Sequence, residues 1–347
     1  MLVDTFLGGP LAEAPANAVR AEALGYDAVS TGEVSHDALF PLVLAAPATQ
    51  RLGLATSIVV AFARTPMALA LQAWDLQQLS GGRLQLGLGS QVKAHITRRF
   101  SMPWSHPAPR MREYVLALKA IWSCWQDGTP LDFEGEFYRH TLMTPAFNPG
   151  PAPGGAPKVS VAAVGEHMTD VAAEVADGLL CHGFTTRRYV EEVTLPRVEG
   201  ALARAGRPSS AFEVKYSPFV ATGATEEQLT EAIKATKAQV AFYGSTPSYR
   251  GVLDLHGWGD LHEELHRLSR QGEWATMASI IDDEVLDAFA VVAEPDQLAR
   301  RIAERIAGLT DRTSFSAPGL SDEQLRDGIA TLRAVATRAE QAGADAT

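Results

Sequence analysis

"LGLATSIVV" at residues 52–60, "TPMALALQAWDLQQLSGG" at residues 65–82 and "RLQLGLGS" at residues 83–90 decide the fold. The first and third stretches are short apolar runs typical of buried strands. The second has apolar residues at helical spacing and ends at two glycines. Strands joined by a crossover helix run parallel. These residues therefore predict one strand–helix–strand unit of a parallel sheet.

The same alternation continues along the whole chain. A helix is predicted over residues 15–24, and a closing amphipathic helix over 322–341. Eight runs are predicted to be strands: residues 2–6, 27–33, 52–60, 83–90, 158–164, 178–184, 212–220 and 312–318. Eight such units predict an α/β protein with the (β/α)8 TIM-barrel fold, formed by a single domain over residues 1–347.

An open doubly wound sheet is the alternative α/β fold. It predicts a G-x-G-x-x-G turn after the first strand, and the residues there, FLGGPLAEAP (6–15), lack that pattern. Three segments interrupt the alternation and are expected to be insertions on loops, at about 91–108, 128–157 and 244–287. The second combines a hairpin pattern with a Pro/Gly-rich loop, and the third is expected to be mostly helical.

The composition excludes several classes of protein. The net charge is −11, which argues against nucleic acid or an anionic membrane as a partner, because both require a basic face. No apolar run approaches the roughly 20 residues of a membrane span, and the N-terminus does not resemble a signal peptide. Cys124 and Cys181 have no metal-ligand spacing. We expect a cytoplasmic protein whose partner is a small-molecule substrate.

In a barrel of this kind the chemistry lies at the carboxyl ends of the strands. The stretch "AAVGEHMTDVAAEVADG" (162–178) turns there from the fifth strand into a helix at Gly165, with Glu166 and His167 in the first helical turn. Exposed N–H groups at a helix start form an anion site, to which Gly183 and Thr185 from the next strand end could contribute donors. We predict a phosphate there. The alternative is that Gly165 only makes a tight turn.

The chain resembles the luciferase-like monooxygenase superfamily, and within it the oxidoreductases that depend on coenzyme F420. The resemblance covers almost the whole length. It rests on "AEALGYDAV", "LGLATSIVVAFARTPMALA", "LQQLSGGRLQLGLGS", "RMREYVLALKAIW", "FEGEFY", "VAAVGEHMTDVAAEVADG" and "DEVLDAFAVVAEPDQLARRI". It implies a barrel with insertions, often a homodimer, that holds a flavin or deazaflavin with its ring at the mouth and its phosphate at the fifth helix.

The resemblance also implies roles for particular residues. Gly165, Glu166 and His167 match the family's phosphate turn, and the loop Gly183, Phe184 and Thr185 completes it. Three residues match a bulge in the third strand, where relatives have a non-proline cis peptide that supports the ring: Thr56, Ser57 and Ile58, with the cis bond between the last two. Glu33 falls where relatives place an acid near the ring, and Gln91 ends the fourth strand beside it.

Hydride transfer requires few catalytic side chains beyond one proton donor or acceptor near the substrate. His36 and His95, on the loops after the second and fourth strands, are the candidates, together with Glu33. Each histidine could instead be an ordinary exposed loop residue. Val34 and Val92 stand where the sugar-phosphate dehydrogenases of the superfamily have His and Glu. We therefore expect an apolar substrate. Its pocket could be lined by Phe6, Phe62, Trp104 and Phe184.

The cofactor could be F420 or FMN. F420 carries an acidic oligoglutamate tail, for which Lys93, Arg98 and Arg99 could form a cationic patch, with Arg110 and Arg112 following in the sequence. FMN has a phosphate without this tail and would need no such patch. The alternative functions are therefore an FMN-dependent monooxygenase or, in another class, a flavin-binding protein without catalysis.

The stretch "LHEELH" (261–266) formally matches the H-E-x-x-H pattern of zinc peptidases. Glu264 stands where such peptidases usually have an uncharged residue, and leucines at 261, 265 and 268 explain the segment as an amphipathic helix. It also lies in an insertion, away from the strand ends. We therefore expect no metal site and no peptidase activity.

Overall fold

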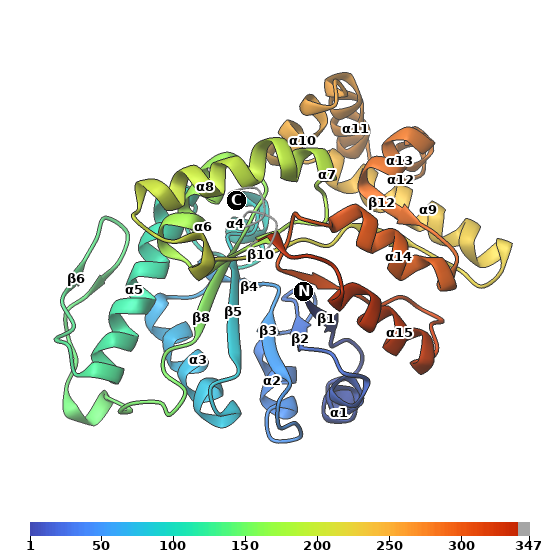
Figure 1. The fold of residues 1–347 in the computed structure, drawn as a ribbon. Coiled ribbons are helices and arrows are strands. Elements are labelled where there is room, and N and C mark those ends of the chain that lie inside the picture. Colours follow the sequence, from blue (N-terminus) through green and yellow to red (C-terminus); the bar gives the residue numbers. More distant parts are fainter. Residues whose placement is uncertain (339–347) are drawn as a thin grey trace.

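The computed structural model describes residues 1–338 and contains a closed parallel barrel surrounded by helices (Figure 1). In pairing order the barrel strands are β3 (Gly53–Thr56), β2 (Ala28–Thr31), β1 (Leu2–Phe6), β13 (Arg312–Ser314), β10 (Glu213–Lys215), β9 (Gly178–Cys181), β8 (Lys158–Ala163) and β5 (Leu84–Gly89). β5 also pairs with β3, which closes the ring. The predicted barrel is confirmed, and all eight predicted runs contribute a strand.

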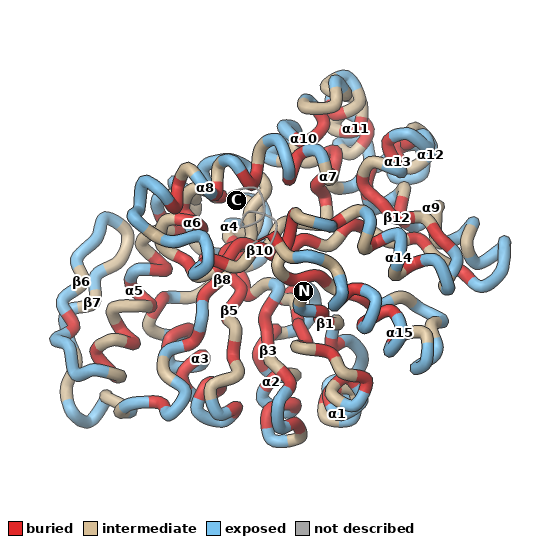
Figure 2. The backbone as a smooth tube through the Cα atoms, viewed as in Figure 1, coloured by how far each residue is buried: buried red, intermediate tan, exposed pale blue. Residues whose placement is uncertain are grey.

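Helices that follow the strands cover the outside of the barrel. They are α1 (Ala14–Leu24), α2 (Leu39–Ala45), α3 (Pro66–Ser80), α5 (Pro107–Asp127), α6 (Glu166–Val175), α8 (Leu195–Arg204), α14 (Pro295–Ile306) and α15 (Asp322–Arg333). The strands and the inward helix faces are buried, whereas the outward helix faces are exposed (Figure 2). Among the described residues, no helix combines the length and the hydropathy that crossing a membrane requires.

Contacts across the barrel show which side chains face its interior. A Cβ atom added to Gly87 of β5 would lie 2.7 Å from Leu180 Cδ1 of β9, although β8 separates the two strands. Both positions therefore face the axis. Because side chains alternate along a strand and paired residues share a face, the same side carries Ala55, Gly89 and Ala162. Small residues thus line the interior at these levels of the barrel.

A largely buried ionic quartet lies inside the barrel. Lys215 Nζ donates to Asp4 Oδ2 at 2.7 Å, and Arg312 Nη1 donates to Asp4 Oδ1 at 2.6 Å. Arg312 Nε also donates to Glu213 Oε1 at 2.8 Å. Asp4 is fully buried. The two cations and two anions balance, which is the condition under which charges are tolerated in an interior.

Aspartates at the amino ends of strands connect neighbouring strands. Asp27, Asp177 and Asp311 each directly precede a strand and accept the backbone N–H of a residue in the adjacent strand: Val3, Val159 and Val214, at 2.8, 2.8 and 2.9 Å. Strand-end N–H groups would otherwise have no acceptor. The aspartates in "YDAV", "ADGL" and "TDRT" therefore have the same structural role at the amino end of the barrel.

The expected insertions contain regular elements of their own. Segment 91–108 holds α4 (Lys93–Arg98), and segment 128–157 holds the antiparallel hairpin of β6 (Phe133–Glu134) and β7 (Arg139–His140). Segment 244–287 holds α10 (Arg250–Leu255), α11 (Gly259–Gln271), α12 (Trp274–Ser279) and α13 (Asp283–Phe289). These helices pack with α9 (Glu226–Gly244) around a second hydrophobic cluster that includes Phe184, Val240 and Phe289.

Two predicted boundaries are wrong. Residues 212–220 form two strands, because the chain leaves the barrel after Lys215 and β11 (Phe219–Ala221) pairs with β12 (Ala290–Val292) outside it. Pro218 lies at the break and has no N–H for a sheet. The predicted closing helix ends at Arg333, before Gln341. Beyond it, Gly308 N donates to Ala336 O, and Arg338 N donates to Thr310 O. The predicted end lies outside the described residues.

Candidate functional site

The third strand is interrupted at the barrel mouth. β3 stops at Thr56, and β4 (Val59–Val60) continues the pairing with β5. The bulge between them is held by backbone bonds to the loop after β2: Ser57 N donates to Thr31 O at 2.6 Å, and Glu33 N donates to Ile58 O at 3.0 Å. The peptide bond between Ser57 and Ile58 is cis, at the position that the resemblance implies. Ser57 is exposed at this end of the barrel.

Thr56 is not available as a ligand through its side chain. Its hydroxyl donates to Gly87 O and accepts from Gly87 N, both at 2.8 Å. The residue is buried, so its role is to join β3 to β5. Beside it, a Cβ atom on Gly89 would lie 2.8 Å from the Ile58 side chain. Of the three predicted bulge residues, Ser57 is exposed and Ile58 is partly buried.

Glu33 is a structural anchor, which corrects its prediction as a catalytic residue. Its carboxylate accepts two hydrogen bonds from Arg64, both at 2.8 Å, and one from Val60 N at 2.7 Å. Burial lowers the pKa of the Arg64 guanidinium, but the hydrogen bonds and charge of Glu33 outweigh burial and raise it. With three hydrogen bonds to its oxygens, Glu33 holds the chain after the bulge.

The start of α6 presents free backbone donors. The N–H groups of Glu166, His167 and Met168 have no acceptor among the described residues. A Cβ atom on Gly165 would meet no atom within 4 Å, so space lies open beside the turn. The Glu166 carboxylate pairs with Arg197, as expected for an acid beside an anion site. The His167 side chain is exposed. This end of α6 can therefore bind an anion through its backbone.

The loop after β9 lies next to this turn, since β8 and β9 are neighbours. Thr185 is buried and its hydroxyl has no hydrogen-bond partner among the described residues. Such a hydroxyl is costly unless a ligand or water satisfies it. Thr186 caps α7 (Arg187–Tyr189) and also contacts His256 Nε2 at 2.8 Å. Thr185 is thus a side chain of this loop whose hydrogen-bonding capacity is unused within residues 1–338.

Phe184 is not a cofactor or pocket residue, contrary to the prediction. Its ring is fully buried and stacks on Phe289 in the second hydrophobic cluster, with centroids 4.4 Å apart. Its N–H donates to His182 Nδ1 at 2.9 Å. Phe62 is also fully buried, whereas Phe6 is 58% exposed at the end of β1. Trp104 packs edge-on against Phe62 at 5.8 Å. Sequence alone could not separate these aromatic residues because each has the same apolar character.

The three remaining predicted residues near the ring lie on exposed or self-contained loops. His36 and His95 are both exposed, and their rings have no hydrogen bond within residues 1–338. The Gln91 side chain folds back so that its Oε1 accepts from Val92 N at 2.9 Å, and its φ of 60° is left-handed. The loops of β2 and β5 therefore supply polar atoms to the rim, and the roles of His36 and His95 as proton donor or acceptor stay predictions.

The residues of the predicted cationic patch have different environments in the structure. Lys93 and Arg98 are exposed on α4. Arg99 bonds to the carbonyl of Val34 and stacks over Phe100, so it ties α4 to the loop after β2. Arg112 pairs with Glu174. Arg110 is buried, where it donates to Tyr138 Oη at 2.8 Å. Arg99 is exposed as well, but Lys93 and Arg98 are the two cations of this set whose side chains have no hydrogen bond or ion pair within residues 1–338.

The H-E-x-x-H residues cap a helix. His262 Nδ1 lies 2.7 Å from Gly244 O, and His266 Nδ1 lies 3.0 Å from Ser245 O, both at the end of α9. These carbonyls are acceptors that a helix end leaves free, so the ring nitrogens donate to them. No group of three His, Cys, Asp or Glu residues in the described chain is arranged to hold a metal ion.

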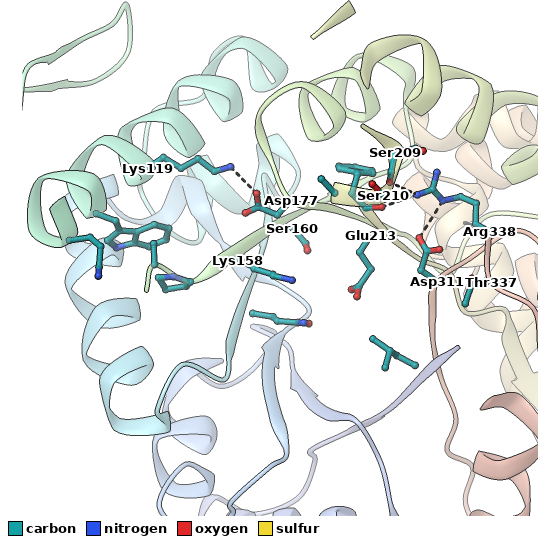
Figure 3. Close-up of a pocket in the computed structure, with 18 of the residues that line it drawn as sticks. Lys119, Lys158, Ser160, Asp177, Ser209, Ser210, Glu213, Asp311, Thr337 and Arg338 are labelled. Atoms are coloured by element: carbon teal, nitrogen blue, oxygen red, sulfur yellow. Dashed lines mark hydrogen bonds and ion pairs between the residues drawn. The ribbon is translucent and has the colours of Figure 1, made fainter. Parts of the chain in front are cut away.

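A large cavity of about 890 Å³ lies at the opposite end of the barrel (Figure 3). It is lined by strand starts, including Gln85, Lys158 and Ser160, and by the ion pairs Lys119–Asp177 and Arg338–Asp311 at 3.0 and 3.3 Å. Strand starts carry the stabilising face of this fold, and the chemistry lies at the carboxyl ends. The paired charges of the cavity fit a stabilising role.

Comparison with known proteins identifies the family. The family model described as luciferase-like monooxygenase matches residues 4–313. The chain belongs to the luciferase-like monooxygenase family. It is 56% identical over 310 residues to the uncharacterized protein Rv1360 of Mycobacterium tuberculosis, a match that covers 89% of this chain and 91% of the relative. The family comprises oxidoreductases and monooxygenases, and the specific reaction differs among its members.

Two reductases extend the comparison. The luciferase-like chain is 28% identical over 287 residues to the 5,10-methylenetetrahydromethanopterin reductase of Archaeoglobus fulgidus, covering 80% of this chain and 81% of the reductase. The structure of the coenzyme F420 dependent tetrahydromethanopterin reductase from Methanopyrus kandleri superposes with a TM-score of 0.75 at 21% identity, covering 95% and 96% of the two chains. The second match supports the barrel fold.

Proposed function

We propose that this protein is an oxidoreductase that transfers hydride between coenzyme F420 and a small, apolar organic substrate. The observation that carries the proposal is the free α6 N-terminus at Gly165 beside the unsatisfied Thr185 hydroxyl. Both lie at the end of the barrel that holds the bulge and its small interior residues. An anion site at this end of the barrel fits a phosphate-bearing ring cofactor. The similarity to the putative coenzyme F420-dependent oxidoreductase Rv3520c of Mycobacterium tuberculosis, 28% identical over 323 residues, supports F420 as that cofactor.

Different residues would bind different parts of the cofactor. The N–H groups of Glu166 and His167 and the Thr185 hydroxyl would bind the phosphate. Ser57 and Ile58 would support one face of the ring, above the small residues of β5. When bound, F420 supplies the carbon that gives or accepts hydride. The chain then has to orient the two reactants and exclude water. Exposed Val34 and Phe6 at the rim favour an apolar substrate.

FMN is the alternative cofactor, and an FMN-dependent monooxygenase the alternative enzyme. Lys93 and Arg98 on α4 favour F420, because FMN has no acidic tail for these exposed cations to meet. The alternative in another class is a flavin-binding protein without catalysis. It requires a mouth that has no space above the bound ring.

Titration of the purified full chain with F420 and with FMN tests the proposal. We expect micromolar or tighter binding of F420 and at least tenfold weaker binding of FMN. Tighter binding of FMN would overturn the cofactor assignment, and binding of neither would overturn the function. Bound F420 that exchanges hydride with no member of a panel of small alcohols, ketones and enones would favour the non-catalytic alternative.

The phosphate turn can be tested with Gly165→Asp. The Gly165 φ and ψ of −77° and 153° suit an aspartate N-cap, and there is open space for its Cβ. The new carboxylate would accept the free N–H groups and repel the phosphate. We therefore expect F420 affinity to fall at least about tenfold while thermal stability stays unchanged or rises.

Gly165→Ala is the matched control for that substitution. It adds a Cβ atom without a charge and should leave affinity within about threefold of the wild type. Equal affinity in the aspartate variant and the wild type would show that the phosphate binds elsewhere.

We also propose that the protein is a homodimer. Phe40, Val43 and Leu44 of α2 and Leu71 of α3 are exposed on two neighbouring helices. Exposed apolar side chains on adjacent elements mark association surfaces. Sedimentation velocity should give the mass of two chains for the wild type and of one chain for Phe40→Asp/Val43→Asp. A monomeric wild type at micromolar concentration would contradict the proposal.

A further inference from the structure

His182 directly follows β9 at the carboxyl end of the barrel. Side chains alternate along this strand: Leu180 faces the axis, as its approach to Gly87 shows, and Cys181 therefore faces outward. The next residue, His182, returns to the axis side. It thus lies at the mouth, one residue before the loop that carries Thr185.

The orientation of the His182 ring is strongly constrained. Phe184 N donates to its Nδ1 at 2.9 Å. The ring also contacts Tyr243 of α9 edge-on, at a centroid distance of 4.5 Å, and the tilted ring of Tyr249, at 5.0 Å. A Cβ atom on the next residue, Gly183, would lie 2.7 Å from the Phe219 ring, so the loop cannot shift in that direction. The ring is thus held by Phe184, Tyr243 and Tyr249.

These contacts also define the protonation state. Because Nδ1 accepts a hydrogen bond, the proton of the neutral ring is on Nε2. Burial lowers the pKa of His182 from 6.5 to about 4, so the ring stays neutral at physiological pH. Nε2–H has no acceptor among the described residues. The ring therefore offers a fixed donor that neither gains nor gives up a proton near pH 7.

We propose that His182 binds the cofactor, by donating its Nε2–H hydrogen bond to an oxygen of the molecule held in the mouth. The inference rests on the proposed function, because it requires a cofactor at this end of the barrel. The oxygen can belong to the phosphate or to the ring and its polyol chain, and the experiment below separates these sources. His36 and His95 have no comparable support from surrounding side chains.

Two substitutions separate the donor from the loop contact. In His182→Asn the side-chain Oδ1 can accept the Phe184 N–H as Nδ1 does, through an Asx turn, but the distal donor is lost. In His182→Gln the amide N–H2 lies near the position of Nε2, while the contact to Phe184 is lost. A purely structural role would be preserved better by asparagine, and a donor role by glutamine.

We expect F420 to bind His182→Asn about tenfold more weakly than the wild type, with the melting temperature of the free protein nearly unchanged. His182→Gln should bind within threefold of the wild type and melt at a lower temperature. A loss of less than threefold in the asparagine variant, or equal losses in both variants, would overturn the inference and leave the proposed function standing. A wild type that binds neither F420 nor FMN would overturn both.

Spectroscopy of 15N-histidine protein gives an independent readout. The His182 signal, identified by its loss in His182→Asn, should show unprotonated Nδ1 and protonated Nε2 from pH 5 to pH 8. Saturating F420 should move the Nε2 signal and leave Nδ1 in place. A shift also produced by inorganic phosphate assigns the acceptor to the phosphate, and a shift produced by F420 alone assigns it to the ring or polyol chain. No shift with bound F420 would overturn the inference.

Discussion

Gly87→Ala is expected to destabilise the protein severely and to abolish cofactor binding. An alanine Cβ at this position would lie 2.0 Å from Thr56 O and 2.7 Å from Leu180 Cδ1. The carbonyl belongs to the backbone of the bulge and cannot rotate away as a side chain could. β5 would have to separate from β3, which breaks both hydrogen bonds between Thr56 Oγ1 and Gly87. We expect a loss of about 3 kcal/mol or more in the free energy of unfolding.

Urea unfolding of three alanine variants measures this effect against matched controls. At Gly165 the added Cβ meets open space, at Gly89 it meets the flexible end of the Ile58 side chain at 2.8 Å, and at Gly87 it meets backbone. The loss of stability should increase in that order. If Gly87→Ala does not accumulate as folded protein, Gly89→Ala still tests the crowding, through weaker F420 binding. Equal stability of all three variants would contradict the argument.

Asp4→Asn is expected to cost about 3–5 kcal/mol of stability, because it leaves a buried positive charge without compensation. In the wild type Asp4 accepts from both Lys215 and Arg312, and Glu213 balances the second cation. The asparagine keeps the size of the side chain but contributes no charge, and its amide hydrogens can face Lys215 or Arg312. The remaining two cations then share a single carboxylate inside the barrel.

An exposed ion pair provides the control for Asp4→Asn. Arg300 and Glu304 on α14 pair at 2.7 Å, with side chains 57% and 53% exposed. Glu304→Gln should cost less than about 1 kcal/mol, because water screens such pairs. Equal costs for Asp4→Asn and Glu304→Gln in urea unfolding at pH 7 would show that the quartet is hydrated and not buried.

Much of the fold is predictable from local pattern. The apolar runs and their helical neighbours identify all eight barrel strands, because alternation and helical periodicity are properties of a few consecutive residues. The error at residues 212–220 has the same origin. Both halves of that run are apolar, and the exit of β11 from the barrel depends on its pairing with β12, some 70 residues later in the chain.

The parts of the candidate site that the backbone forms could be predicted from the sequence. Gly165 could be located because a glycine at a strand end indicates backbone geometry directly, and the Ser57–Ile58 bulge could be located through the family resemblance. Side-chain roles were harder to predict. His36 and His95 are exposed, and Phe184 is buried in another cluster. His182 was not among the candidates, although it lies in the predicted strand 178–184. A neighbouring glycine and a strand end were the only signals for it.

Short-range pattern in the chain is thus enough to establish the parallel barrel, the end of it that carries chemistry and the turn at Gly165. The roles of Glu33, His182 and Asp4 depend on residues that are distant in the sequence. Arg64 lies 31 residues from Glu33, and Arg312 lies 308 residues from Asp4. Such distant partners determine the charge environment, the burial and the hydrogen-bond geometry of each side chain. These contacts form only when the closed barrel brings the segments together.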